Sequence, residues 1–108
     1  MGKTKIETIE EFNNVLEKES KFIFIKHSLT CPISKAAFDE YEQFVSEYED
    51  VPTYYLYVQE AKDLSNHIAQ AFEIKHESPQ ALLFEDGKVK WNTSHRNITK
   101  DALVAAAE

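Results

Sequence analysis

The chain has 108 residues, a formal net charge of −7 at pH 7 and one cysteine. This length predicts one domain over residues 1–108, and the plentiful aliphatic and aromatic residues argue against disorder. The acidic balance, without a lysine or arginine cluster, argues against nucleic acid or an anionic membrane as the main partner. No apolar run approaches the roughly 20 residues of a membrane span. Because the start, MGKTKIETIEEF, has no apolar signal segment, we expect a cytoplasmic protein with a reduced thiol.

The first elements in chain order are a short strand, a helix and a central strand. Residues 3–6 predict the short strand. Thr8 and Glu11 have the spacing of a capping box, and the apolar residues that follow predict a helix over residues 9–19. FIFIKH, residues 22–27, is rich in strand-forming residues without polar alternation. That pattern is typical of a central strand covered on both faces.

The middle of the chain predicts two more helices around another strand. A long helix over residues 32–48 is indicated by apolar residues that share one face, namely Ala37, Tyr41, Phe44, Val45 and Tyr48. TYYLYV, residues 53–58, predicts the strand, which Pro52 precedes. The helical spacing of Leu64, Ile68 and Phe72 predicts the next helix.

The last part of the chain predicts a hairpin and a final helix. QALLFEDGKVKW, residues 80–91, reads as two strands joined at Asp86 and Gly87, a strong hairpin signal. Thr99 then caps the helix, with Ile98 and Leu103 spaced as a hydrophobic staple.

The resulting order, β-α-β-α-β-α-β-β-α, predicts an α/β fold. Its early alternation implies parallel strands with helices on both faces, and the hairpin adds an antiparallel edge, which makes the sheet mixed. Ligand sites in such sheets lie beyond the carboxyl ends of strands. Cys31 follows the strand over residues 22–27 and therefore lies at that end.

The sequence around Cys31 predicts a reactive thiol at a helix N-terminus. Proline is favoured at the first helical position, so Pro32 makes Cys31 the N-cap. The free amides of Ile33 and Ser34 and the helix dipole then favour a negative charge on the sulfur. We expect them to lower the thiol pKa from about 8.5 into the range of roughly 3.5–7.5 found for activated cysteines.

The sequence disfavours other roles for Cys31. A lone cysteine is often a buried, inert core residue, but Cys31 follows the polar Ser28 and Thr30 rather than lying inside an apolar run. A cysteine protease is disfavoured by the small size of the chain. A phosphatase loop is disfavoured because Ala37 stands where its arginine would be, six residues after the cysteine. The scattered histidines lack the short spacing of a metal site.

The strand–Cys-Pro-x-Ser–helix pattern in this order of elements resembles the thioredoxin superfamily. Ser34 stands where that superfamily often has the second cysteine of a Cys-x-x-Cys pair. TCPIS is similar to the active site of the monothiol bacilliredoxins of the YtxJ type. The similarity extends over nearly the whole chain through the stretches KHSLTCPIS, ESPQALLFEDGKVKW and SHRNIT.

This resemblance implies a thioredoxin-like fold and a thiol–disulfide exchange reaction. Cys31 would be the nucleophile that removes bacillithiol from S-bacillithiolated client proteins, with bacillithiol as co-substrate and no tightly bound cofactor. The loop at Ser78 and Pro79 would hold a cis proline opposite the cysteine. The remaining site residues fall into a thiolate-stabilising set, Pro32, Ile33 and Ser34, and a substrate-binding set, Thr30, Ser78, Pro79, His95 and Arg96.

Three questions stay open at the level of sequence. Bacillithiol carries carboxylates, so a local cation is expected, with Lys35, Lys75 and Arg96 as candidates. His27 is either a support for the thiolate or an ordinary strand-end residue, and His95 is a second candidate for tuning Cys31. The alternative function is a thioredoxin-like adaptor domain in which Cys31 does no turnover.

Overall fold

The computed structural model describes residues 3–108 and contains one five-stranded mixed sheet in the order β1-β3-β2-β4-β5. Strands β1 and β2 pair in parallel with β3, β4 is antiparallel to β2, and β5 is antiparallel to β4. The strands are β1 (Lys3–Lys5), β2 (Lys21–His27), β3 (Thr53–Tyr57), β4 (Gln80–Glu85) and β5 (Lys88–Ser94).

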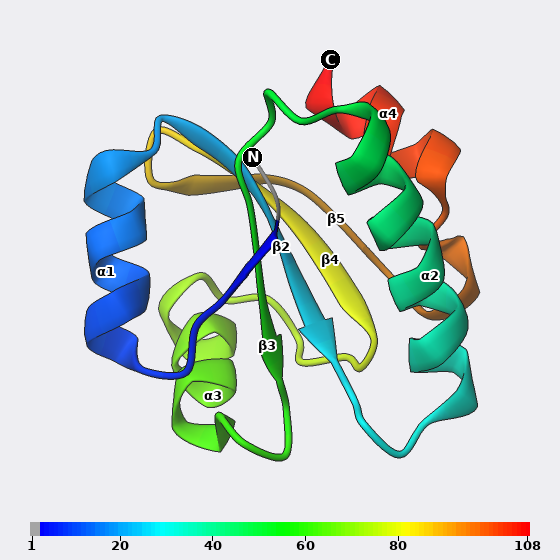
Figure 1. Ribbon diagram of the computed structural model, residues 1–108. Helices are drawn as coiled ribbons and strands as arrows, with labels where there is room; N and C mark the ends of the chain where they lie inside the picture. Colours follow the sequence, from blue (N-terminus) through cyan, green and yellow to red (C-terminus); the bar gives the residue numbers. More distant parts are fainter. Residues whose placement is uncertain (1–2) are drawn as a thin grey trace.

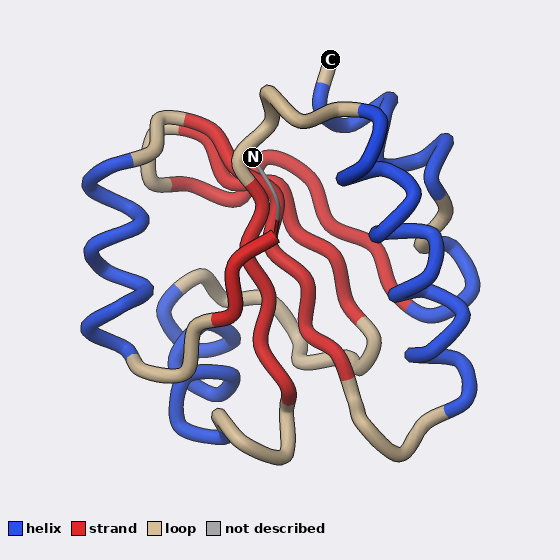
Figure 2. Tube along the Cα trace, in the orientation of Figure 1, coloured by secondary structure: helices blue, strands red, loops and turns tan. Residues whose placement is uncertain are grey.

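Helices cover both faces of this sheet, as the element order predicts. Helices α1 and α3 lie on one face and α2 and α4 on the other (Figure 1 and Figure 2). The helices are α1 (Ile9–Lys18), α2 (Pro32–Glu47), α3 (Lys62–Ala71) and α4 (Lys100–Ala107), and a short 3-10 helix, η1 (His95–Asn97), precedes α4.

The central strand β2 explains why both faces need a helical cover. Successive side chains of a strand point to opposite faces. Phe22 and Phe24 therefore enter the core beneath α1 and α3, while Ile23 and Ile25 enter the core beneath α2 and α4. Lys26 follows the same alternation to the α1 and α3 side and is 0% exposed. The apolar pattern of residues 22–27 predicts the central strand but not the burial of a lysine within it.

Element ends differ from the sequence expectations by a few residues. The first helix ends at Lys18, and the capping box between Thr8 and Glu11 is present. The last strand runs beyond residue 91 to Ser94 and continues into η1, which the sequence pattern does not predict. The predicted staple before α4 agrees with the burial of Ile98 and Leu103 in one core cluster.

Candidate functional site

Cys31 lies at the N-cap of α2, directly before Pro32 at the first helical position, as predicted. Its backbone is extended, with φ −102° and ψ 121°. The side chain is partly exposed, and the sulfur closes no cap hydrogen bond with the backbone of α2. The sulfur therefore stays accessible to an incoming disulfide while it lies close to the first amides of the helix.

The electrostatic surroundings of Cys31 favour the thiolate. The backbone amide of Ser34 makes the largest contribution to lowering the pKa of the Cys31 thiol below its ordinary value. The amide of Ile33 and the Ser34 hydroxyl lower the pKa further, while desolvation opposes them. A lower thiol pKa leaves more of the nucleophilic form at neutral pH.

Ser34 also links the helix to the segment that precedes the cysteine. Its side chain is 0% exposed, and its hydroxyl oxygen accepts a hydrogen bond from the backbone N–H of Ser28 at 3.2 Å. The residue that replaces a second cysteine thus has a structural contact as well as a place beside the sulfur.

We expect Ser34→Ala to reduce the reactivity of Cys31 much less than removing the sulfur does. The amides of Ile33 and Ser34 remain in the variant, so the thiol pKa rises only partway toward its ordinary value. The Ser28 amide loses its partner, which costs about 1–3 kcal/mol of stability if water does not replace it. Alkylation rates across pH and a urea unfolding curve measure the two effects. A variant as unreactive as Cys31→Ser would show that the Ser34 hydroxyl, rather than the helix amides, activates the sulfur.

A glutamine from the β3–α3 connection holds the segment before Cys31. The Gln59 side-chain oxygen accepts from the backbone N–H of Leu29 at 3.0 Å. Its amide nitrogen donates to the hydroxyls of Ser28 at 2.9 Å and Thr30 at 3.4 Å. Leu29 is left 50% exposed. Sequence reasoning predicts Thr30 near the site but gives no signal for Gln59, because their contact joins residues 29 positions apart.

The Ser78–Pro79 peptide bond is cis, as predicted. The Pro79 carbonyl accepts a hydrogen bond from the backbone N–H of His95 at 3.0 Å. His95 has a positive φ of 55°, which is unusual for a residue other than glycine. The buried Ser78 hydroxyl has no hydrogen-bond partner within residues 3–108. The proline loop and the start of η1 therefore form one connected unit.

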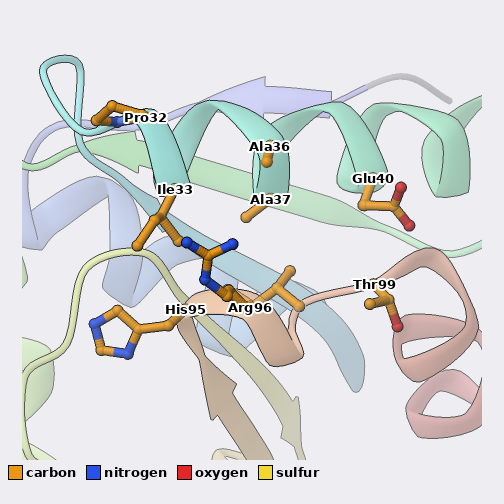
Figure 3. A pocket seen from close by; sticks show the side chains of 9 residues that line it. Pro32, Ile33, Ala36, Ala37, Glu40, His95, Arg96 and Thr99 are labelled. Carbon is orange, nitrogen blue, oxygen red and sulfur yellow. The ribbon is translucent and has the colours of Figure 1, made fainter.

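A groove of about 420 Å³ runs between α2 and η1, and its lining begins with Pro32, the residue after Cys31. Figure 3 shows the first turns of α2 on one side and His95 and Arg96 on the other, with the Arg96 side chain reaching toward α2. Four predicted site residues line this groove, whereas five others are not in its lining, namely Thr30, Cys31, Ser34, Ser78 and Pro79. The lining residues are Pro32, Ile33, Ala36, Ala37, Glu40, His95, Arg96, Ile98 and Thr99.

Among the three candidate cations, Arg96 is the one placed in this groove. Its guanidinium forms no hydrogen bond or ion pair within the described part of the chain. Lys35 instead pairs with Asp39 at 3.4 Å, and Lys75 pairs with Glu77 at 3.8 Å. An unpaired guanidinium offers a planar set of donors that suits a carboxylate.

His27 does not act as a second cation beside the site at neutral pH. Its ring packs against Phe38 at 4.5 Å and Tyr57 at 5.5 Å between centroids. Desolvation in this setting is the main reason why the pKa of His27 lies below its ordinary value, so the imidazole is neutral at pH 7. A neutral ring adds no positive charge to stabilise a thiolate.

Metal-binding clusters and membrane-spanning helices are absent from the described residues. In residues 3–108, no group of three or more His, Cys, Asp or Glu side chains is placed to hold a metal ion. No helix in that range is long and apolar enough to cross a membrane.

Comparison with known proteins agrees with this geometry. A solved structure of a protein with a thioredoxin fold is 42% identical, with a TM-score of 0.92, covering 98% of this chain and 94% of its own. Mitochondrial thioredoxin 3 from Saccharomyces cerevisiae is 22% identical (TM-score 0.77, 96% and 92% covered). A mutant thioredoxin from Halobacterium salinarum is 18% identical (TM-score 0.79, 99% and 88% covered). These last two show the fold alone.

The fold is therefore thioredoxin-like, as the sequence resemblance implies. A family model for the monothiol bacilliredoxin BrxC matches residues 4–103. Family and fold together support a thiol redox function for the site around Cys31. The chain belongs to the monothiol bacilliredoxin family.

Proposed function

We propose that the protein is a monothiol exchange enzyme that removes bacillithiol from S-bacillithiolated proteins in the cytoplasm. The observation that carries this proposal is the combination of a partly exposed, acidified Cys31 with a serine at the position of a resolving cysteine. With no second thiol in the chain, Cys31 cannot form an intramolecular disulfide. The chemistry left to it is exchange with an external thiol and an external disulfide.

The reaction consists of two thiol–disulfide exchanges. The Cys31 thiolate attacks the bacillithiol sulfur of the mixed disulfide, and a new bond forms between Cys31 and bacillithiol. The bond to the client breaks, and the client sulfur leaves as a thiolate that takes a proton from water. A second thiol, such as another bacillithiol, then attacks the adduct and leaves with the first as a disulfide, while Cys31 returns to the thiolate. Each step exchanges one disulfide for another, so the electrons balance.

The groove between α2 and η1 is the proposed place for the small thiol during this exchange. Its lining includes Pro32 and Ile33, the two residues after Cys31, and Arg96 supplies an unpaired cation within it. We assign Arg96 to the carboxylates of bacillithiol because its guanidinium is in no ion pair among the described residues, while Glu40 in the same groove accepts a hydrogen bond from the backbone N–H of Lys100 at 2.8 Å. Ser78 and Pro79 are proposed to orient the bound mixed disulfide.

Alkylation with iodoacetamide across pH tests the activation of the thiol. We expect the rate to rise with a midpoint below the roughly 8.5 of an unperturbed cysteine, because the helix amides stabilise the thiolate. The same protein unfolded in urea is the matched control and should show the ordinary midpoint. A native midpoint at or above roughly 8.5 would favour the adaptor function, in which Cys31 does no turnover.

The assignment of the cation is tested by neutralising two candidates separately. Arg96→Gln should weaken bacillithiol capture by Cys31 roughly 10- to 150-fold, since a hydrogen bond to a charged group contributes about 1.5–3 kcal/mol. Lys35→Gln removes the same charge four residues after Cys31 but outside the groove, so its effect should be smaller. The measurement is the rate of mixed-disulfide formation with oxidised bacillithiol. If Lys35→Gln has the larger effect, Arg96 is not the carboxylate ligand.

A further inference from the structure

Lys26 is a buried amine that the proposed exchange reaction does not use. Its side chain is 0% exposed in the central strand, five residues before Cys31. The amine donates a hydrogen bond to the backbone carbonyl of Ser65 on α3 at 3.0 Å. It also lies 3.2 Å from Nδ1 of His76, on the segment that leads to the cis proline. One buried charge thus joins three separate parts of the chain.

A second buried polar side chain fastens the same segment. Gln80 is 1% exposed and stands opposite Lys26 in the antiparallel pairing of β2 and β4. Its amide nitrogen donates to the Lys75 carbonyl at 3.0 Å, and its oxygen accepts from the backbone N–H of Glu77 at 3.4 Å. Lys26 and Gln80 together therefore hold residues 75–77, directly before Ser78 and Pro79.

The hydrogen bond with Lys26 determines which ring nitrogen of His76 carries the proton. A lysine ammonium can only donate, so Nδ1 of His76 must accept and its proton is on Nε2. The Ser65 hydroxyl also lies 3.2 Å from this Nδ1. If His76 took up a second proton, two cations would face each other, and the contact with Lys26 would be lost. Within residues 3–108, no carboxylate is in ion-pair contact with Lys26 to offset this repulsion.

We propose that Lys26 is a positioning residue for the segment over residues 75–79, and that protonation of His76 breaks the hydrogen bond through which Lys26 holds this segment. This inference rests on the proposed function in one respect, namely that the Ser78–Pro79 loop orients the mixed disulfide. The groups that bear on the switch are Lys26 from β2, Ser65 from α3, Gln80 from β4 and, on the segment itself, Glu77. The Glu77 carboxylate in turn lies 3.8 Å from Lys75 and 3.8 Å from His95 of η1. Desolvation and then the charge of Lys26 lower the pKa of His76, whereas Glu77 opposes them.

An NMR titration of the histidine rings tests the contact independently of any exchange activity. In the wild type, His76 should be the Nε2–H tautomer and should titrate below the ordinary pKa of about 6.5. In Lys26→Met the buried charge is gone, so the His76 midpoint should move up toward that value. Lys62→Met, an exposed lysine one turn before Ser65, is the matched control and should leave it unchanged. Identical His76 midpoints in wild type and Lys26→Met would overturn the proposal.

Two reaction rates then separate positioning of the segment from activation of the sulfur. Lys26→Met should slow exchange with a bacillithiolated protein roughly tenfold, because a misplaced partner loses reactive geometry. Its alkylation by iodoacetamide, which needs no loop contact, should change less than about twofold. As pH falls, exchange by the wild type should drop as His76 protonates and its contact with Lys26 is lost. Lys26→Met has no such contact to lose, so its exchange should be slow at every pH and should lack this step. If both rates fall equally, or Lys26→Met keeps the wild-type pH profile, Lys26 has no positioning role.

The failures of the two proposals are distinguishable. If the wild type exchanges with no mixed disulfide at all, the proposed function is wrong. Hydrogen exchange of the backbone amides of residues 75–77 then tests the positioning role of Lys26 without any exchange reaction. Protection that is lost in the wild type below the His76 midpoint, and that is already low at every pH in Lys26→Met, supports the switch. Protection independent of pH in both proteins contradicts it.

Discussion

Replacing Cys31 with serine is expected to abolish both exchange steps, because a serine hydroxyl stays protonated near neutral pH and is a far poorer nucleophile than a thiolate. Cys31 is the one cysteine in the chain, so no other residue can carry the adduct. The variant should neither acquire bacillithiol from a modified protein nor return the client to its free thiol. Intact-protein mass spectrometry of both partners, before and after mixing, measures this.

The matched comparison for this experiment is Ser34→Ala, which removes one hydroxyl beside the sulfur and leaves the thiol in place. It should retain adduct formation at a reduced rate. The Cys31→Ser variant should keep the wild-type fold, since serine is close to cysteine in size and is favoured at the N-cap position that Cys31 occupies. Residual transfer by correctly folded Cys31→Ser would show that the chemistry does not pass through this sulfur.

Local patterns account for most of what the sequence predicts correctly. The N-cap position of Cys31 follows from Pro32, and the capping box of α1 follows from Thr8 and Glu11. Each of these depends on residues within one turn of one another. The central position of β2 follows from an apolar run that needs a cover on both faces.

Contacts between distant residues account for what sequence reasoning misses. Gln59 holds the segment before the cysteine from 29 to 31 positions away. Lys26 meets His76 across 50 positions, inside a strand whose pattern reads as apolar. The choice of Arg96 among three candidate cations also needed the fold, because only packing of η1 against α2 shows which cation lines the groove.

Lys26→Met is expected to raise the free energy of unfolding at pH 7. Desolvation lowers the pKa of Lys26 to about 8 from the 10.5 of an exposed lysine. Because the folded-state pKa is depressed, the charged form is disfavoured by folding. This penalty is fully present below pH 8 and disappears as pH rises from about 8 to 10.5. At about 1.4 kcal/mol per pKa unit, removing this penalty stabilises the protein by at most about 3 kcal/mol. The stability lost with the hydrogen bonds of Lys26 to Ser65 and His76 reduces this gain.

Urea unfolding at pH 7 and pH 10 measures this gain, with Lys62→Met as the control for losing an exposed positive charge. The gain should be larger at pH 7 than at pH 10, and Lys62→Met should change stability by no more than about 0.5 kcal/mol. A more stable but slower enzyme would mean that Lys26 is kept for positioning at the expense of stability. A clear destabilisation at both pH values would instead make Lys26 a structural residue whose hydrogen bonds outweigh its desolvation.

The proposed function is tested most directly by following one turnover on the wild-type protein. The reduced protein is mixed with an S-bacillithiolated client in the absence of other thiols, quenched with acid, and examined by intact-protein mass spectrometry. We expect the bacillithiol mass to leave the client and to appear on Cys31 as a stable mixed disulfide, which added bacillithiol then releases. A client that stays modified beside an unmodified Cys31 would contradict exchange and favour the adaptor function.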